Sequence, residues 1–557
     1  MSTTYHGTVP VGAARTPTGL WHALGSPPLG RRVPGTVPVA LAAMAFMTVV
    51  CLVVVPTGAN LWYADALSHL TVARRLADSM LPGFQQLGTV WLPVPHLLLM
   101  PFVQTMWLWS TGWAGAILGI LCFGGSCAAL YRICARLGLS RGGRLTALLV
   151  LACCPDFVYL HTTALTEPVL FVSILGTVAG LVHWATAARP LSGGELAVFA
   201  GIPAAAGILT RYEGWVLTIG MVIFVTVVES RRSRGRVTRL WRFVVLRRVL
   251  PALAAPIAAG SWWLAYNYNM FGDPLDFMFG PYSAYAQQQV AVEQGTLTTA
   301  DHFGLSLYVY NRAVWDLLGP VVTLGGVLGL LVCIARHGLG LITLTLGLLF
   351  GTYCFEIASL YLGQTIMLTP HSLPPGLFNV RYGLAAFPFF ALGTAVVFET
   401  LRQVRRGPLT VAALVPVLLL ARPLWVLADP TERSPMLVEG RSLDAGRPNQ
   451  AAAYLRDHYD GGGILMDESV ASNGIIPLVR VPVKEWYLRA SGDYYTAALE
   501  QPAKYARWIL VATDRGGLSL DTADQVYAQM LEHPELFTAY APVYEGEGHA
   551  IYRRSDS

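Results

Sequence analysis

The segment VALAAMAFMTVVCLVVV, residues 39–55, decides the class of fold, because no charged side chain interrupts it. An α-helix rises about 1.5 Å per residue, so an apolar run of about 20 residues can cross the hydrocarbon core of a bilayer. Further apolar runs are centred near residues 123, 152, 177, 203, 221, 258, 326, 350, 390 and 417. The sequence therefore predicts a polytopic α-helical membrane protein with about 11 spans.

The composition agrees with this prediction and excludes a chain of soluble modules. Of the 557 residues, 54% are hydrophobic and 13% are charged, whereas soluble proteins normally carry about twice that share of charge. The net charge of +5 does not indicate a nucleic-acid partner, because the basic residues lie at the ends of apolar runs. The eight cysteines also belong to apolar segments, so we expect neither a disulfide framework nor a zinc site.

The distribution of arginine predicts how the chain is oriented in the plasma (inner) membrane. Loops on the predicted cytoplasmic side carry 20 arginines, whereas the predicted outer side carries six before residue 429. Cytoplasmic loops of membrane proteins are enriched in basic residues, so we expect a cytoplasmic N-terminus and an extracytoplasmic C-terminus. One further apolar segment, WLPVPHLLLMPFVQTMWLW at residues 91–109, contains three prolines, and we expect a re-entrant or interfacial outer helix there.

Three regions follow from these patterns: a cytoplasmic tail at 1–36, a transmembrane domain at 37–428 with a first outer loop at 57–112, and an extracytoplasmic domain at 429–557. The last region holds 19 of the 33 acidic residues and has an ordinary globular composition. Its periodicity predicts a small α/β domain. The expected helices are 449–458 and 521–533, and the expected strands are 463–469, 507–513 and a hairpin centred on 545–548.

Acidic residues of the first outer loop are the first candidates for chemistry. Asp65 and His69 are four residues apart and would share one face of a helix. Asp65 is a candidate general base, and His69 a candidate orienting group or metal ligand. The alternative is an interfacial amphipathic helix whose polar face carries these side chains without a catalytic role.

The second outer loop, YLHTTALTEPVLF at residues 159–171, contributes His161 and Glu167. Thr166 and Glu167 suit the cap and first turn of the helix that follows. Alternatively, Glu167 faces Asp65 across a cavity, where it would position an acceptor or bind a metal ion. His161 is a candidate substrate contact.

Two arginines, Arg211 and Arg381, stand near the outer ends of predicted spans. A guanidinium at that depth suits bidentate binding of a phosphate group. Alternatively, each side chain reaches the interface beside an aromatic neighbour, Tyr212 or Tyr382. For Arg211, an ion pair with Glu213 or another outer acid is a third alternative.

The order of these features resembles the GT-C glycosyltransferases that use polyprenyl-phosphate sugars, such as the aminoarabinose transferases of lipid A and the protein O-mannosyltransferases. The shared features are an acid in a long first outer loop, a proline-rich apolar helix after it, TEP at 166–168, RY at 381–382, and a polar C-terminal domain. The resemblance implies that Asp65 lies at the reacting centre, that Glu167 is the second-loop acid, and that Arg381 and Tyr382 lie near the carrier phosphate. Family members usually have two adjacent acids in the first loop, whereas Ala66 follows Asp65 here.

We therefore expect a membrane glycosyltransferase of the cell envelope. It would transfer a sugar from a polyprenyl-phosphate carrier to a protein, lipid or cell-wall glycan acceptor on the outer face, with inversion at C1. As an alternative role, Asp65, His69 and Glu167 are candidate ligands of a divalent metal ion. The rival hypotheses are a lipid or solute transporter and a non-catalytic scaffold. The sequence shows no related halves, and its membrane-domain acids gather on the predicted outer side, so an enzyme is favoured over a transporter.

Overall fold

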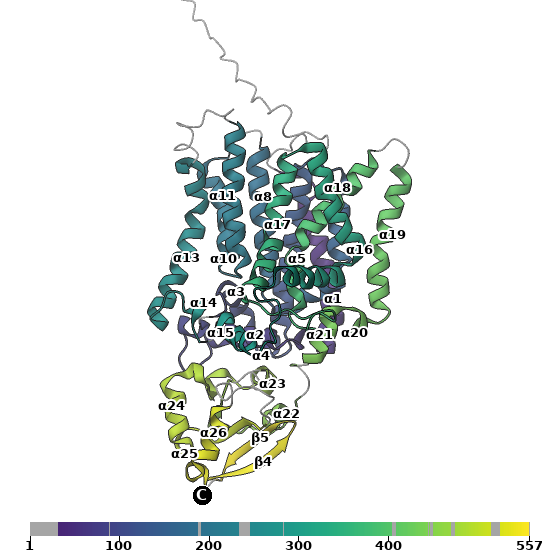
Figure 1. Cartoon of the computed structure of the whole chain (residues 1–557). Coiled ribbons are helices and arrows are strands. Elements are labelled where there is room, and N and C mark those ends of the chain that lie inside the picture. The colour runs from purple at the N-terminus through teal and green to yellow at the C-terminus, as the bar shows by residue number, and fades with distance from the viewer. Residues whose placement is uncertain are drawn as a thin grey trace, which may run out of the picture.

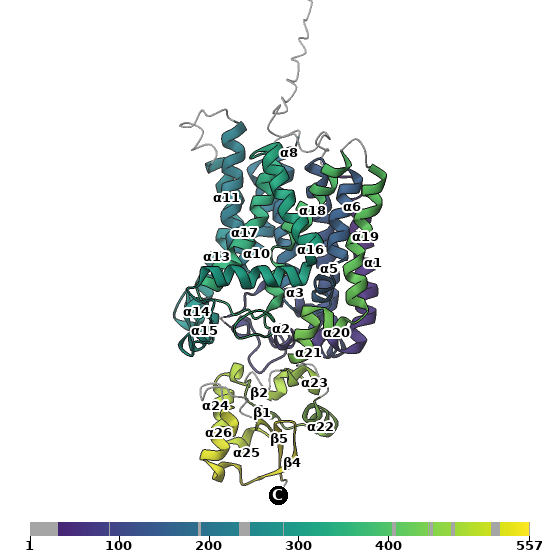
Figure 2. The same ribbon diagram turned by 45° about the vertical axis from the view of Figure 1, so that its right-hand side comes forward.

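The computed structural model describes residues 32–88, 90–187, 191–232, 245–281, 283–403, 408–443, 445, 449–468, 474–513 and 524–555. A bundle of long helices forms the larger part, and a small α/β domain lies beyond one end of the bundle (Figure 1). The helices run roughly side by side in both views (Figures 1 and 2).

Within the described residues, eight segments are long and apolar enough to cross a membrane. They contain α1 (Thr36–Val54), α5 (Trp113–Arg136), α8 (Glu167–Thr186), α11 (Glu213–Arg232), α13 (Leu250–Phe271), α16 (Phe303–His337), α17 (Leu341–Tyr361), and η6 (Val380–Leu384) with α18 (Phe387–Arg402). The helix α16 has two parts that meet at Gly319, whose φ of 74° lies in the left-handed region that favours glycine. Figure 2 shows the first part lying across the bundle.

The polytopic helical architecture is confirmed, but two of the 11 expected spans are divided into shorter helices. The run near residue 152 forms only α6 (Arg141–Ala152), since Pro155 starts a separate short helix, α7 (Pro155–Leu160). The run near residue 203 is divided into α9, η4 and α10 between Gly193 and Ile208, with a π-helical turn in the middle. The run near residue 417 forms α19 (Pro408–Leu427), a helix of 20 residues, as expected for a span.

The leftover apolar segment at 91–109 lies outside the set of long helices, as expected. It forms α3 (Val94–Val103) and the short α4 (Met106–Ser110). Both lie at the end of the bundle nearest the C-terminal domain, beside α2 (Ala64–Arg75) of the first loop (Figure 1). This placement agrees with the juxtamembrane helix predicted from its prolines.

The C-terminal domain contains a five-stranded mixed sheet with strand order β2-β1-β3-β5-β4. The parallel part is formed by β1 (Ile464–Met466), β2 (Trp486–Tyr487) and β3 (Trp508–Ala512), and the antiparallel part by β4 (Tyr540–Gly546) and β5 (His549–Arg554). The main helices are α22 (Gln450–His458), α24 (Asp493–Glu500) and α26 (Gln525–Glu532). The predicted α/β domain is confirmed, and only the two-residue β2 was too short for a periodicity signal.

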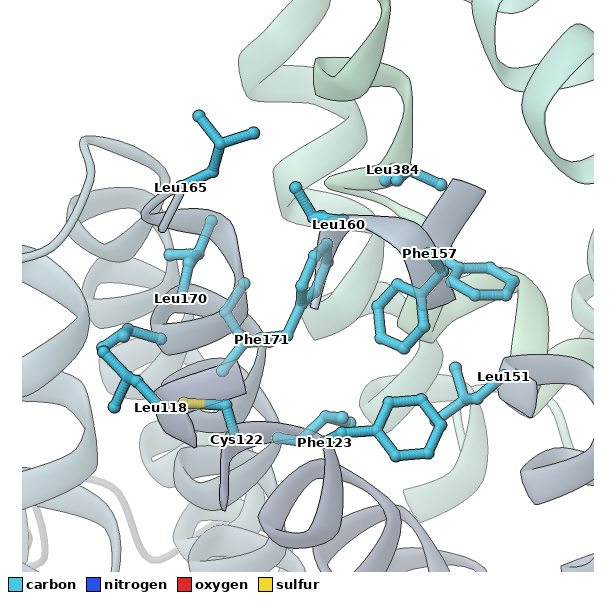
Figure 3. Packing of buried hydrophobic residues seen from close by; sticks show 14 of the residues in the cluster. Leu118, Cys122, Phe123, Leu151, Phe157, Leu160, Leu165, Leu170, Phe171 and Leu384 are labelled. Carbon is cyan, nitrogen blue, oxygen red and sulfur yellow. The ribbon is translucent and has the colours of Figure 1, made fainter. Parts of the chain in front are cut away.

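A tightly packed apolar core fixes the end of α8 where Glu167 lies. Phe157 packs edge-on against Phe171, with ring centroids 5.0 Å apart, and its ring lies 6.0 Å from that of Phe123 (Figure 3). Gly119 of α5 lets the second loop approach closely, because an added Cβ would lie 1.9 Å from the carbonyl oxygen of His161. The loop before α8 therefore packs closely against α5 at Gly119.

Candidate active site

Five charged side chains from four segments form a continuous series of ion pairs, the ion-pair chain, at the end of the bundle nearest the C-terminal domain. Asp65 Oδ2 lies 2.5 Å from Arg381 Nη2, and Arg381 Nε lies 3.0 Å from Glu167 Oε1. The same Glu167 oxygen lies 3.0 Å from Arg211 Nη1, and Arg211 Nε lies 2.8 Å from Glu213 Oε1. Segments more than 300 residues apart in sequence therefore meet at one site.

Asp65 lies at the solvent-accessible end of the ion-pair chain. It lies in the first turn of α2, and its side chain is 39% exposed, whereas those of Arg381 and Glu167 are each 5% exposed. A molecule arriving from outside the bundle would therefore meet Asp65 before the buried groups behind it.

Glu167 lies in the first turn of a helix, as one alternative predicted, and also takes part in the site, as the other predicted. It is the first residue of α8, where a negative charge is favourable, but Thr166 makes no side-chain cap. The Glu167 carboxylate turns instead to Arg381 and Arg211. It does not face Asp65 across an empty space, because the Arg381 guanidinium lies between the two carboxylates.

Arg381 is held from several sides and is buried. The side chain begins from η6, and its guanidinium lies 5.4 Å from the ring centroid of Tyr63 and 5.1 Å from that of Tyr382. A side chain that reached out to the interface would be exposed, so the burial of Arg381 excludes that alternative. Its Nη1 makes no hydrogen bond with a described residue, which leaves donor capacity for a ligand oxygen.

Arg211 forms an ion pair with Glu213, as the third of its predicted alternatives proposed. Its guanidinium is used by Glu167 and Glu213, and it stacks 4.7 Å from the ring centroid of Tyr382. The Tyr382 ring thus contacts the guanidinium groups of both Arg211 and Arg381. These contacts place Arg211 and Tyr382 directly beside Arg381, and their predicted contacts with substrate stay a prediction.

His69 is directed into the protein and does not accompany Asp65. Its Nδ1 lies 2.9 Å from Nε2 of His96 on α3, and its ring packs 4.5 Å from that of Trp91. Burial, together with the charges of Arg381 and Arg211, lowers the pKa of His69 to about 3. The imidazole is therefore neutral at physiological pH, and the prediction that it orients or ligates at the Asp65 carboxylate is not supported.

The proposed metal ligands do not come together in the described part of the chain. No group of three His, Cys, Asp or Glu side chains there has an arrangement that could hold a metal ion. Glu167 Oε1 already accepts from two guanidinium groups, and His69 is bonded to His96.

His161 lies in the hydrophobic core, so its predicted contact with substrate is corrected. It is fully buried, its Nδ1–H donates to the carbonyl oxygen of Phe157 at 2.8 Å, and its ring lies 4.5 Å from that of Phe157 and 5.3 Å from that of Phe123. Burial lowers its pKa to about 4. From the second loop, Glu167 and the hydroxyl of Thr166 reach the ion pairs, whereas His161 lies in the core.

The neutral state of His161 makes a prediction about stability. An unfolded histidine has a pKa of about 6.5, so between pH 6.5 and 4 the unfolded chain binds more protons than the folded one. The contribution of His161 to stability is therefore lost as pH falls through this window, by up to about 1.4 kcal/mol per pH unit. In His161→Phe, the drop in thermal midpoint of the detergent-purified protein between pH 7.5 and 5 should be smaller. Transfer activity at pH 7.5 should stay normal, and an unchanged pH dependence of the midpoint would contradict this assignment.

Two buried acids at the site were not identified from the sequence. Glu356 of α17 is buried close to Glu213, and Glu439 of α21 (Pro435–Leu443) is buried close to Arg381. An acid inside an apolar span is a recognised sign of function, which makes Glu356 detectable in principle. Nothing in the local sequence distinguishes Glu439 from the other acids of the C-terminal region.

A separate cavity of about 580 Å³ lies between α6, α16 and α19. Its lining is mainly apolar and includes Trp315, Leu318 and Trp425, with Arg422 reaching in from α19. None of the predicted site residues lines it, so it is distinct from the ion-pair chain.

The fold of the whole chain is similar to that of solved structures. The structure of ArnT from Cupriavidus metallidurans bound to undecaprenyl phosphate matches with a TM-score of 0.54 and 12% sequence identity, over 92% of this chain and 98% of that chain. An oligosaccharyltransferase from Archaeoglobus fulgidus, tethered to an acceptor peptide, matches with a TM-score of 0.41 and 12% identity, over 94% of this chain and 74% of that one. No family model and no curated protein matches the chain.

The likeness to ArnT shows a shared fold. It extends over almost the whole of both chains, so it includes the helical bundle and the C-terminal domain together. The GT-C architecture predicted from the order of the motifs is thereby confirmed.

Proposed function

We propose that this protein is a membrane glycosyltransferase that moves a sugar from a polyprenyl-phosphate carrier to an acceptor hydroxyl. The observation that carries the proposal is the direct contact between the accessible carboxylate of Asp65 and the buried guanidinium of Arg381. Transfer from a phosphate carrier needs a base for the acceptor and a cation for the departing phosphate, and this pair supplies both. The fold shared with ArnT, whose structure holds undecaprenyl phosphate, supports the choice of donor.

The ion pair suggests how donor binding prepares the base. Asp65 accepts from Arg381 Nη2, a donor that a phosphate oxygen would also use. When the carrier phosphate takes the place of Asp65 on the guanidinium, the carboxylate becomes free to face the acceptor. Glu167 stays bonded to Arg381 Nε and keeps the guanidinium in place during this exchange.

The chemical step is then a single displacement. The acceptor oxygen forms a bond to C1 of the sugar while the bond between C1 and the phosphate oxygen breaks. The hydroxyl proton passes to the Asp65 carboxylate, and the electron pair of the broken bond leaves with the polyprenyl phosphate beside Arg381. Attack from the face opposite the phosphate inverts the configuration at C1.

We place this reaction on the outer face of the plasma membrane. The ion-pair chain lies at the end of the bundle that carries the C-terminal domain, whereas the described arginines Arg136, Arg231 and Arg402 stand at the far ends of α5, α11 and α18 (Figure 1). The rule that basic loops stay in the cytoplasm supports this orientation. The acceptor would be a protein, a lipid or a cell-wall glycan reached from that side.

The decisive experiment supplies the purified protein with a panel of polyprenyl-phosphate sugars and looks for sugar transfer or donor hydrolysis by mass spectrometry. We expect consumption of at least one donor by the wild type and its loss in Asp65→Asn. A protein that binds these lipids and moves them across proteoliposome membranes, but cleaves none of them, would overturn the proposal in favour of a transporter.

A further inference from the structure

The helix α21, which follows the last helix of the bundle, reaches the backbone that carries Arg381. Glu439 of α21 is fully buried, and its two carboxylate oxygens accept from the backbone N–H groups of Asn379 at 2.7 Å and Val380 at 3.0 Å. Asn379 has a φ of 54°, in the left-handed region, and η6 starts directly after it. N–H groups at the start of a helix lack intrahelical partners, and Glu439 supplies the acceptors that fix this turn.

The same helix also holds the segment that carries Asp65. The hydroxyl of Tyr63 donates to the carbonyl oxygen of Met436 at 2.9 Å. A Cβ added at Gly440 would lie 3.1 Å from the Tyr63 ring and 3.3 Å from Cβ of Trp62, so the two backbones approach closely there. Tyr63 precedes α2, two residues before Asp65, and its ring lies beside the Arg381 guanidinium. One face of α21 therefore contacts the supports of both reacting groups.

The start of α21 is fixed to the bundle by a buried acid. Asp156 of α7 accepts from the Ser434 hydroxyl at 2.7 Å and from the backbone N–H of Met436 at 3.0 Å. Asp156 is fully buried, and burial raises its pKa while the nearby Arg422 lowers it. Both hydrogen bonds set the position of α21 relative to the core.

The other end of α2 is held by the C-terminal domain itself. Arg75 Nη1 lies 2.7 Å from Glu468 Oε1, and both side chains are 13% exposed. The Val483 N–H donates to Asp78 just beyond the helix. The polypeptide beyond the last span thus contacts α2 at both of its ends.

We propose that α21 is a positioning element of the active site, with Glu439 as the residue that places the Arg381 guanidinium opposite Asp65. This inference rests on the proposed function. The helix α21 is hydrogen-bonded to the start of η6 through Glu439 and to Tyr63, just before α2, through the Met436 carbonyl, and Gly440 packs against the Tyr63 ring. The C-terminal region is consequently required for donor binding even though it supplies no reacting group.

The main test compares Glu439→Gln with Glu432→Gln, a matched change at a side chain that is 70% exposed on the neighbouring turn, α20 (Pro430–Arg433). A glutamine oxygen accepts one of the two N–H bonds, and its amide nitrogen cannot accept the other. Glu439→Gln should therefore raise the donor KM by about 10-fold, the loss typical of a hydrogen bond to a charged group, with a smaller change in kcat. Glu432→Gln should leave both constants unchanged.

A double-mutant cycle separates positioning from a general loss of structure. In an Arg381→Ala background, Glu439→Gln should add little to the loss of donor affinity, since Glu439 acts through Arg381. Equal and additive losses in both backgrounds would overturn the inference, as would a Glu439→Gln enzyme with normal donor KM. If Glu439→Gln alters the thermal midpoint, Gly440→Ala provides a second variant, which should lower transfer by crowding Tyr63 without touching Glu439.

Failure of this inference is distinguishable from failure of the proposed function. A wild-type protein that cleaves no donor would end the proposed function whatever the variants do. A wild-type protein that transfers sugar, together with a Glu439→Gln variant that behaves as Glu432→Gln does, would end only the assignment to α21.

Discussion

Asp65→Asn should lower the rate of sugar transfer by about 100-fold to 10,000-fold, the usual cost of removing a general base. Asparagine keeps the shape of the side chain and can still accept a hydrogen bond from Arg381, but it cannot take the hydroxyl proton. The loss should therefore appear in single-turnover chemistry within the bound complex. Mass spectrometry of the transferred sugar after mixing enzyme, donor and acceptor measures that rate directly.

The same variant should bind the donor at least as tightly as the wild type does. Asp65 occupies Arg381 Nη2 at 2.5 Å before the donor arrives, so a phosphate oxygen must displace a charged partner. Removing that charge weakens the competitor. Asp273→Asn is the matched control, because Asp273 is an exposed outer-loop acid that caps only its own turn. If Asp65→Asn weakened donor binding while chemistry in the bound complex stayed normal, Asp65 would be a binding residue and not the base.

The class of fold could be predicted from the sequence because it depends on local composition. The length of each apolar run decides whether a helix can cross the membrane, and the high share of acids after residue 429 separates the C-terminal domain. The span near residue 152 is one of the two that are divided. Its hydropathy resembles that of the other runs, but Pro155 divides it, and whether a helix continues past such a break depends on its neighbours.

The site was only partly predictable, for a related reason. Asp65, Glu167 and Arg381 were selected by their chemical type, their position at the ends of predicted spans and a family resemblance, and the structure brings all three together. The spacing of Asp65 and His69 predicts a shared helix face, but it cannot show that His96 from another helix lies closer to His69. Side-chain partners are set by tertiary packing, which periodicity does not contain.

Glu439 shows the limit most plainly. It lies 60 residues beyond Asn379 and among many other acids, so neither spacing nor composition distinguishes it. Its contacts form only when α21 folds back on η6, and it then becomes a buried carboxylate with two backbone donors.

An alternating series of acids and arginines in which each charge is paired can remain buried, whereas burying any one of these charges without its partner would be costly in free energy.

That pairing determines how Arg381→Ala should behave. In the proposed mechanism the guanidinium contacts the carrier phosphate both before and during transfer, so its loss should weaken donor binding by roughly 10-fold to 150-fold, the range for hydrogen bonds to charged groups. Arg381→Lys should recover only part of this affinity, since an ammonium cannot reproduce the planar fork. Isothermal titration or a fluorescent polyprenyl-phosphate competitor in detergent measures the affinity.

Stability must be measured alongside, because Arg381→Ala also leaves the buried Glu167 with Arg211 as its one remaining cation. Breaking a buried pair on one side typically costs about 3–5 kcal/mol, so a lower thermal midpoint is expected for Arg381→Ala and a smaller drop for Arg381→Lys. Arg441→Ala is the control, since that side chain is 59% exposed and lies 3.9 Å from its acidic partner. The assignment of phosphate binding to Arg381 fails if Arg381→Lys, folded and with a near-normal midpoint, binds donor as tightly as Arg441→Ala does. In that case the arginine serves only to neutralise Asp65 and Glu167, and the carrier phosphate binds elsewhere.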